Sequence, residues 1–251
     1  MQAAVTVQNY SPAFSRNTSI AVFNDWYDIV PADTPELLDH AYRLRYQVYC
    51  RERCYEESGA FPDQREIDRF DNRSVHSLVV SRIDDSCLGT VRLVFPDVKN
   101  PDNCFPMQQI CRNFRADRLR PLCFQTTAEI SRFAISKMAR KLTAGIDDSI
   151  KSDGLQSTVK DRIARPSVVL GLMKAIVRMS REHGITDWLA VMEPSLLRLL
   201  ARYGIFFQPI GPLVDFHGMR QPCQANLDKL LARVRQECPE VWEFVVHDIC
   251  P

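Results

Sequence analysis

The stretch Thr-Thr-Ala-Glu-Ile-Ser-Arg-Phe-Ala-Ile, residues 126–135, is rich in the β-branched and apolar residues that favour a strand. Two similar runs precede it at 74–82 and 87–95, and turn-forming residues join them at 84–86. Beyond residue 135, helical and extended patterns alternate along the chain. This order predicts a mixed α/β fold built on one central sheet.

The flanking segments are consistent with that fold. We expect β-formers at 19–30, a helix that starts at Asp33-Thr34-Pro35, a helix at 166–181 closed by His183-Gly184, a strand at 185–192, a helix at 194–203, two short strands around His217-Gly218, and a helix at 227–246 interrupted near Pro239. Residues 1–18 lack any periodicity and are expected to form a flexible arm, so residues 19–251 are predicted to be a single domain.

Composition excludes several classes of protein. The 251 residues are 45% hydrophobic and 25% charged, with a formal net charge of +1, so nothing indicates a global nucleic-acid or anionic-membrane binder. No apolar stretch is long enough to span a bilayer, and the first 30 residues lack the pattern of a secretory signal. We therefore expect a cytoplasmic protein without a membrane span.

The nine cysteines form no repeated CxxC pair, and we predict no metal site. Reduced thiols that fill small core positions account for their number. Cys50 and Cys54 lie one helical turn apart, but the sequence places no histidine to activate either as a nucleophile.

Charged residues break the apolar pattern at four positions. Arg45 shares a helical face with apolar residues, Arg92 lies inside the strand at 87–95, and Glu129 and Arg132 lie inside the strand at 126–135. Since buried unpaired charge is costly, these side chains must pair with each other or with a ligand. Asp68 and Asp71 are the natural carboxylate partners, and we expect all six to meet in one cleft. A purely structural ion-pair network is the competing interpretation.

Glu129 and Arg132 are three residues apart, so strict alternation sends them to opposite faces of a sheet. A β-bulge brings both to one face, and bulges are frequent beside active sites. The sequence therefore predicts a bulge in this fourth strand, near residues 130–131.

Five motifs occur in order along the chain: Leu-Arg-Tyr-Gln-Val-Tyr (44–49), Glu-Ile-Asp-Arg-Phe-Asp-Asn (66–72), Gly-Thr-Val-Arg-Leu-Val-Phe-Pro (89–96), Glu-Ile-Ser-Arg-Phe-Ala-Ile-Ser-Lys (129–137) and His-Gly-Ile-Thr-Asp (183–187). Together they resemble the acyl-homoserine-lactone (autoinducer) synthases and the long-chain N-acyl amino acid synthases. Within these bacterial enzymes the resemblance is greatest to the exosortase/PEP-CTERM-associated acyltransferases. It implies the three-layer GNAT N-acyltransferase fold.

The resemblance also implies an activity, transfer of an acyl group from a pantetheine thioester to an amine (EC 2.3.1). Its site positions correspond to Arg45, Asp68, Asp71, Arg92, Glu129 and Arg132, with Tyr49, Tyr55 and Phe133 beside the substrate. Tyr55 replaces the tryptophan of the autoinducer synthases, which changes the wall around the amine acceptor.

The chemistry of these residue types suits that activity. An ammonium group must lose a proton before it attacks a thioester, and Glu129 is the candidate base, with a pKa raised by burial. Backbone N–H groups freed at the bulge are candidate oxyanion donors, and the guanidinium of Arg92 or Arg132 suits an acceptor carboxylate.

The sequence favours acyl carrier protein over coenzyme A as the acyl donor, with no tightly bound cofactor. The glycine-rich pyrophosphate loop of acetyl-CoA-dependent members of the fold is missing after residue 135. Residues 112–165 hold 12 Lys and Arg against 6 Asp and Glu, a local basic region suited to an acidic carrier protein. Lys137, Arg140 and Lys141 are the candidate carrier contacts.

Three functions remain open. We favour an N-acyltransferase that moves a medium or long acyl chain to an amino acid or similar metabolite. An autoinducer synthase that uses S-adenosylmethionine as the amine is the second. A non-catalytic domain that binds acyl carrier protein or an acyl ligand is the third.

Overall fold

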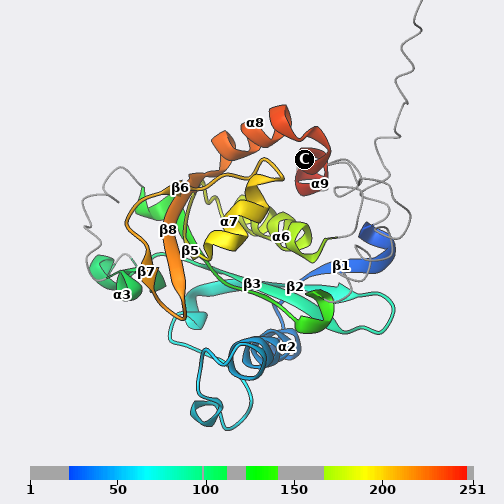
Figure 1. Ribbon diagram of the computed structural model, residues 1–251, viewed down its shortest axis with the longest axis vertical. Helices are drawn as coiled ribbons and strands as arrows, with labels where there is room; N and C mark the ends of the chain where they lie inside the picture. The colour runs from blue at the N-terminus through cyan, green and yellow to red at the C-terminus, as the bar shows by residue number, and fades with distance from the viewer. Residues whose placement is uncertain (1–22, 98, 112–122, 141–166, 248–251) are drawn as a thin grey trace, which may run out of the picture.

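A computed structural model describes residues 23–97, 99–111, 123–140 and 167–247. The predicted mixed α/β fold is confirmed, with one central sheet between two layers of helices (Figure 1). Its strands are β1 (Tyr27–Pro31), β2 (Ser74–Ser81), β3 (Cys87–Val94), β4 (Thr127–Ile135), β5 (Asp187–Met192), β6 (Gln208–Pro209), β7 (Val214–Asp215) and β8 (Met219–Asn226). The order across the sheet is β1-β2-β3-β4-β5-β8-β6, with β7 paired to β8. Only the β4–β5 pair among these is parallel.

The helices of the described ranges are α2 (Pro35–Tyr46), the short α3 (Pro106–Ile110), α6 (Val168–Glu182), α7 (Pro194–Ala201), α8 (Leu227–Glu237) and α9 (Pro239–Val246). The Thr34 hydroxyl caps α2 with Pro35 in its first turn, as predicted. A short stretch of π-helix, Gln47–Glu52, continues α2 and was not predicted. Every helix in the described part of the chain is too short or too polar to cross a lipid bilayer.

Alternation along β2 explains why helices cover both faces of the sheet. Leu78 is fully buried between the sheet and α2, where it packs with Ala41. The next residue, Val79, packs on the other face of the sheet, in the larger core between the sheet and α6. The interruption predicted near Pro239 separates α8 from α9, and α9 packs against α6. Figure 1 shows α2 below the sheet and α6 above it.

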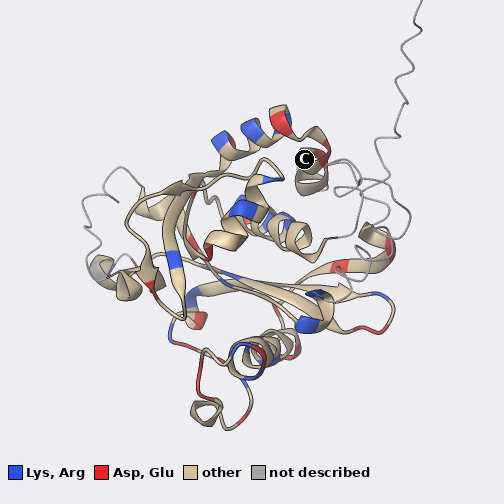
Figure 2. Ribbon diagram, viewed as in Figure 1, with Lys and Arg blue, Asp and Glu red and all other residues tan. Residues whose placement is uncertain are grey.

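One predicted boundary differs from the structure, and two predicted segments lie outside the described residues. The first strand begins at Tyr27, because residues 23–26 are helical. The arm expected at 1–18 and most of the basic region at 112–165 fall outside the described ranges. Within those ranges, both Lys and Arg and Asp and Glu lie on the helices (Figure 2).

The site lies where β4 and β5 stop pairing. The two strands are in register only from Thr127 to Ile130 on β4 and from Asp187 to Ala190 on β5. Beyond Ile130, β4 continues against β3, while β5 continues against β8. The two strands therefore part at the middle of the sheet and leave room between them for a ligand.

Candidate active site

A cavity of about 1020 Å³ occupies the gap between the two strands. Its walls come from the π-helix and the loop after it, from α3, from β4, from the first turn of α6, from the end of β5 with α7, and from the β7–β8 turn. Of the predicted site residues, Tyr49, Tyr55, Glu129, Arg132, Phe133 and Arg140 line this cavity.

The predicted charged residues meet in one buried network of ion pairs, whose members are Arg45, Glu66, Asp68, Asp71, Arg92 and Arg132. Arg45 donates to Glu66 at 2.6 Å and to Asp71 at 2.7 Å. Arg92 donates to Asp68 at 2.6 Å and to Asp71 at 2.7 Å. Arg132 donates to Glu66 at 2.8 Å and lies 2.9 Å from Asp68.

Glu66 was missed as a member of the network. It lies in the motif quoted for Asp68 and Asp71, and its side chain joins Arg45 to Arg132. Charge balance was the available signal: three arginines need three carboxylates, and Glu129 makes no ion pair with any described residue.

The network keeps Glu66 and Asp71 ionised despite burial. Burial alone would raise the pKa of Glu66, but Arg45 and Arg132 outweigh it and lower that pKa to about 2. The pKa of Asp71 is likewise lowered against burial, by Arg45 and Arg92. These groups are permanent charges at neutral pH and cannot exchange protons during a reaction there.

The expectation that six charged residues share one cleft is wrong in part. Only Glu129 and Arg132 line the cavity, whereas Arg45, Asp68, Asp71 and Arg92 do not. Arg45 and Arg92 are completely buried behind the cavity wall, because each satisfies its guanidinium with carboxylates from the 66–71 segment.

The predicted bulge exists but lies two residues further on. Ser131 stays in register opposite Arg92, and Ala134 pairs with Thr90, so Arg132 and Phe133 together face the single residue Val91. Arg132 adopts φ +51°, a strained value for a residue with a side chain. The reason for the shift is a hydrogen bond of 3.0 Å from Arg92 Nε to the Ser131 hydroxyl, which fixes the register up to that point.

Glu129 differs from the network acids in its surroundings. It is 2% exposed, and its Oε2 accepts a hydrogen bond of 2.9 Å from the Met107 N–H in α3. Burial raises its pKa to about 8, and that one hydrogen bond and the more distant Arg92 only partly oppose the effect. A carboxyl group that titrates near neutral pH therefore borders the cavity, as the sequence predicted.

Aromatic rings form one wall of the cavity. Tyr49 lies under the Arg132 guanidinium, 5.6 Å from ring centroid to Cζ, and stacks with Tyr55 at 6.4 Å. Tyr55 in turn stacks on His217 at 5.3 Å with an interplanar angle of 18°. Phe133 lines the cavity from the bulge.

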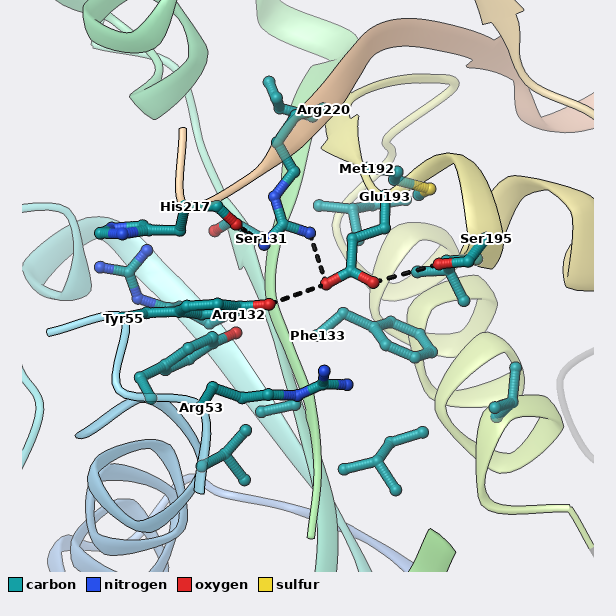
Figure 3. A pocket seen from close by; sticks show the side chains of 18 of the residues that line it. Arg53, Tyr55, Ser131, Arg132, Phe133, Met192, Glu193, Ser195, His217 and Arg220 are labelled. Carbon is teal, nitrogen blue, oxygen red and sulfur yellow. Dashed lines mark hydrogen bonds and ion pairs between the residues drawn. The ribbon is translucent and has the colours of Figure 1, made fainter. Parts of the chain in front are cut away.

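A polar cluster next to this wall was missed by the sequence reasoning. Glu193 pairs with Arg220 at 2.6 Å and accepts hydrogen bonds from the hydroxyls of Tyr55 at 3.3 Å and Ser195 at 3.1 Å (Figure 3). His217 lies 3.3 Å from Glu56. Three separate segments contribute these residues, so only the folded chain brings them together.

The predicted carrier contacts have three different outcomes. Lys137 is exposed just after β4, and its backbone N–H donates to Glu52. Arg140 lines the cavity and pairs with Glu52 at 2.8 Å. Lys141 lies outside the described residues.

The thiols give no sign of a nucleophile or a metal site in the part of the chain described. Cys50 is buried, which raises its pKa, and Cys54 is exposed. No group of three or more His, Cys, Asp or Glu side chains within the described ranges is placed to hold a metal ion.

Comparison with solved structures shows the architecture. TofI, solved in a ternary complex with an inhibitor and MTA, matches with a TM-score of 0.57 and 18% identity, over 83% of this chain and 95% of that one. The CoA-dependent acyl-homoserine lactone synthase BjaI, solved with MTA, matches with a TM-score of 0.56 and 19% identity, over 83% and 89%. FeeM, an N-acyl amino acid synthase from uncultured soil microbes, matches with a TM-score of 0.54 and 13% identity, over 82% and 94%.

Residues 44–145 match the sequence model of the acetyltransferase (GNAT) domain. The chain has the GNAT fold. The domain match identifies an acyltransferase, and it covers the network, the bulge and Glu129. No curated protein sequence matches the chain significantly.

Proposed function

We propose that this GNAT-fold protein is an N-acyltransferase that moves a medium or long acyl chain from acyl carrier protein to the amine of an amino acid or similar metabolite. The observation that carries the proposal is Glu129, a buried carboxyl group with a pKa of about 8 that borders a cavity of about 1020 Å³. A base that titrates near the working pH is suited to removing a proton from an ammonium group.

The reaction follows from this placement. Glu129 takes a proton from the acceptor ammonium, directly or through one water, and the free amine attacks the thioester carbonyl carbon. The C–N bond forms, the C–S bond breaks, and the pantetheine thiolate takes the second proton from the former ammonium nitrogen, so that a neutral amide and a free thiol result. Backbone N–H groups at the Arg132–Phe133 bulge are the candidate donors to the oxyanion.

The network has a positioning role in this proposal. Arg45 and Arg92 hold the 66–71 segment against β3 and β4, and Arg132 is held on the cavity side by Glu66 and Asp68. The network thereby fixes the bulge, although four of its members do not reach the substrate.

The proposal that acyl carrier protein is the acyl donor rests on the sequence and on the contacts of Glu52. Glu52 accepts hydrogen bonds from the Lys137 N–H at 2.7 Å and from Arg140 at 2.8 Å, so a carboxylate of the chain itself already occupies these donors just after β4. A coenzyme A pyrophosphate would have to displace it. A carrier protein instead adds contacts outside the cavity, for which the basic region at 112–165 is the candidate surface.

The test uses the purified full chain with palmitoyl and octanoyl thioesters of acyl carrier protein and an equimolar mixture of the twenty amino acids. Release of free thiol together with an N-acyl amino acid of the expected mass supports the proposal. Acyl carrier protein binding without thiol release would instead show a binding domain. An acyl-homoserine lactone formed from added S-adenosylmethionine would show the autoinducer chemistry. This is the second candidate function because the fold is similar to that of the AHL synthase LasI and of the acyl-homoserine lactone synthase BjaI.

The same assay with palmitoyl-CoA tests the donor. We expect at least a tenfold lower kcat/KM with the coenzyme A thioester, and a marked loss of activity with acyl carrier protein as salt is raised, because charge attraction steers the carrier. Equal efficiency with both thioesters would contradict the carrier-protein assignment while leaving the acyltransferase intact.

A further inference from the structure

The arginines expected to bind an acceptor carboxylate are already in use. Arg92 is fully buried, and its three guanidinium nitrogens donate to Asp68, Asp71 and Ser131. Arg132 directs Nε and Nη2 to Glu66. A carboxylate in the cavity therefore needs another cation.

The polar cluster beside the aromatic wall supplies a rigid frame but little free charge. Arg220 is 13% exposed, and Glu193 neutralises it at 2.6 Å. Glu193 also accepts from Tyr55 and Ser195, so its oxygens are well satisfied. Arg220 in addition covers the Tyr55 ring at 5.4 Å, which holds that ring in place.

Arg53 is different from these neighbours. It lines the same cavity and is exposed, and it has no carboxylate within 4.0 Å among the described residues. Figure 3 shows its side chain extended into the pocket toward Phe133, joined to nothing by a dashed line. It is close enough to Glu193 to help lower the pKa of that carboxyl, though Arg220 contributes more against the effect of burial.

We propose that Arg53 binds the carboxylate of the amine acceptor, which makes this residue a determinant of specificity for α-amino acids over simple amines. Glu193 pairs with Arg220, whereas Arg53 has no carboxylate within 4.0 Å among the described residues, so its guanidinium is available for a carboxylate in the cavity. A guanidinium donates two parallel hydrogen bonds to such a group. The inference rests on the proposed function, with Glu129 at the acceptor nitrogen and Arg53 at its carboxylate.

The phosphate group of the donor pantetheine is also an anion that a guanidinium binds. Independent measurements of KM for the acceptor and for acyl carrier protein distinguish the acceptor carboxylate from this phosphate as the ligand of Arg53. The variants are Arg53→Gln, Arg53→Lys and the control Arg51→Gln, a nearby exposed arginine that does not line the cavity. The acceptors are the amino acid identified by product mass and its α-carboxamide.

We expect Arg53→Gln to raise KM for the amino acid about 10- to 100-fold, the scale of a charge-assisted pair of hydrogen bonds. The carboxamide should be a poor acceptor for the natural chain and insensitive to the substitution. Arg53→Lys should recover part of the loss, and Arg51→Gln should behave as the natural chain. A raised KM for acyl carrier protein, or equal losses with acid and amide, would overturn the assignment.

Calorimetric titration with each of the twenty amino acids in turn gives a readout that does not need turnover. Weaker binding in Arg53→Gln than in the natural chain supports the site even if no acyl transfer is found, in which case only the proposed function fails. Equal binding to both proteins would refute the site whatever the activity.

Discussion

At the scale of single residues, partners rather than burial decide what a carboxyl group does here. Glu66 and Glu129 are both almost completely buried. Glu66 faces two arginines and has a pKa of about 2, whereas Glu129 faces one backbone N–H and has a pKa of about 8. The first is therefore a fixed charge, and the second is the group suited to proton transfer.

Glu129→Gln should lower kcat by about 10²- to 10⁴-fold, the usual contribution of general acid–base catalysis. The amide oxygen of glutamine can still accept the Met107 N–H, so the fold should be kept. Steady-state kinetics and circular dichroism check both statements. Full activity in the folded variant would remove Glu129 as the base.

The pH profile tests the same residue independently. With a pKa of about 8, Glu129 is largely protonated at pH 7, so kcat/KM should rise with pH and level off above about pH 8. A profile that is already flat from pH 6 upward would show that Glu129 does not titrate in the rate-determining step.

At the scale of elements, the close approach of α6 to β3 depends on a glycine. A Cβ built on Gly89 would lie 2.8 Å from Val168 Cγ1 and 3.2 Å from Leu172 Cδ1, both on α6. Val168 also lines the cavity. The distance between α6 and the sheet at Gly89 therefore also affects the wall of the cavity.

Gly89→Ala should lower the free energy of unfolding by about 1–3 kcal/mol, the usual cost of overpacking a core. Gly59→Ala is the matched control, because a Cβ there meets nothing within 4 Å. Urea denaturation of the two variants checks the contrast. Similar stabilities would show that α6 adjusts freely over the sheet.

Element boundaries were largely predictable because they depend on local rules. Thr34 and Pro35 start α2, Pro239 separates α8 from α9, and Gly184 follows α6 with φ +66°. The π-helix and the exact place of the bulge were not predictable, because contacts between distant segments set them. The Arg92–Ser131 hydrogen bond spans 39 residues.

At the scale of the whole molecule, buried ionisable groups set how stability depends on pH. Glu66 and Asp71 have lower pKa values in the folded chain than in the unfolded chain. They therefore stabilise the fold fully at a pH above their pKa values in the unfolded chain, and this stabilisation is lost as pH falls. Burial lowers the pKa of His76 from 6.5 to about 3, so its contribution also falls with pH below 6.5. Glu129 has the opposite sign, and its contribution is lost as pH rises from 4.5 to about 8.

We therefore predict that the free energy of unfolding is nearly constant between about pH 4.5 and 6.5, because the contributions of His76 and Glu129 change in opposite directions there. It should decrease below pH 4.5 and above pH 6.5. Glu129→Gln should abolish the loss between pH 6.5 and 8 and turn this plateau into a rise with pH from 4.5 to 6.5, because His76 is then unopposed there; the loss below pH 4.5 should be unchanged. Urea midpoints from pH 3 to 9 measure this. A natural chain that gains stability from pH 6.5 to 8 would contradict the assignment.

The sequence by itself determined the order of elements, the presence of a bulge in β4 and the three arginines and two aspartates that pair, because propensity, capping and the cost of buried charge act locally or by residue type. Only the tertiary structure decided that β4 and β5 part after Ile130 and, among the residues that the structure describes, that Glu129 is left out of the ion pairs and that Arg53 faces the cavity with no carboxylate within 4.0 Å. Those facts depend on which distant segments meet, and no local pattern encodes the distance between two charges far apart in the chain.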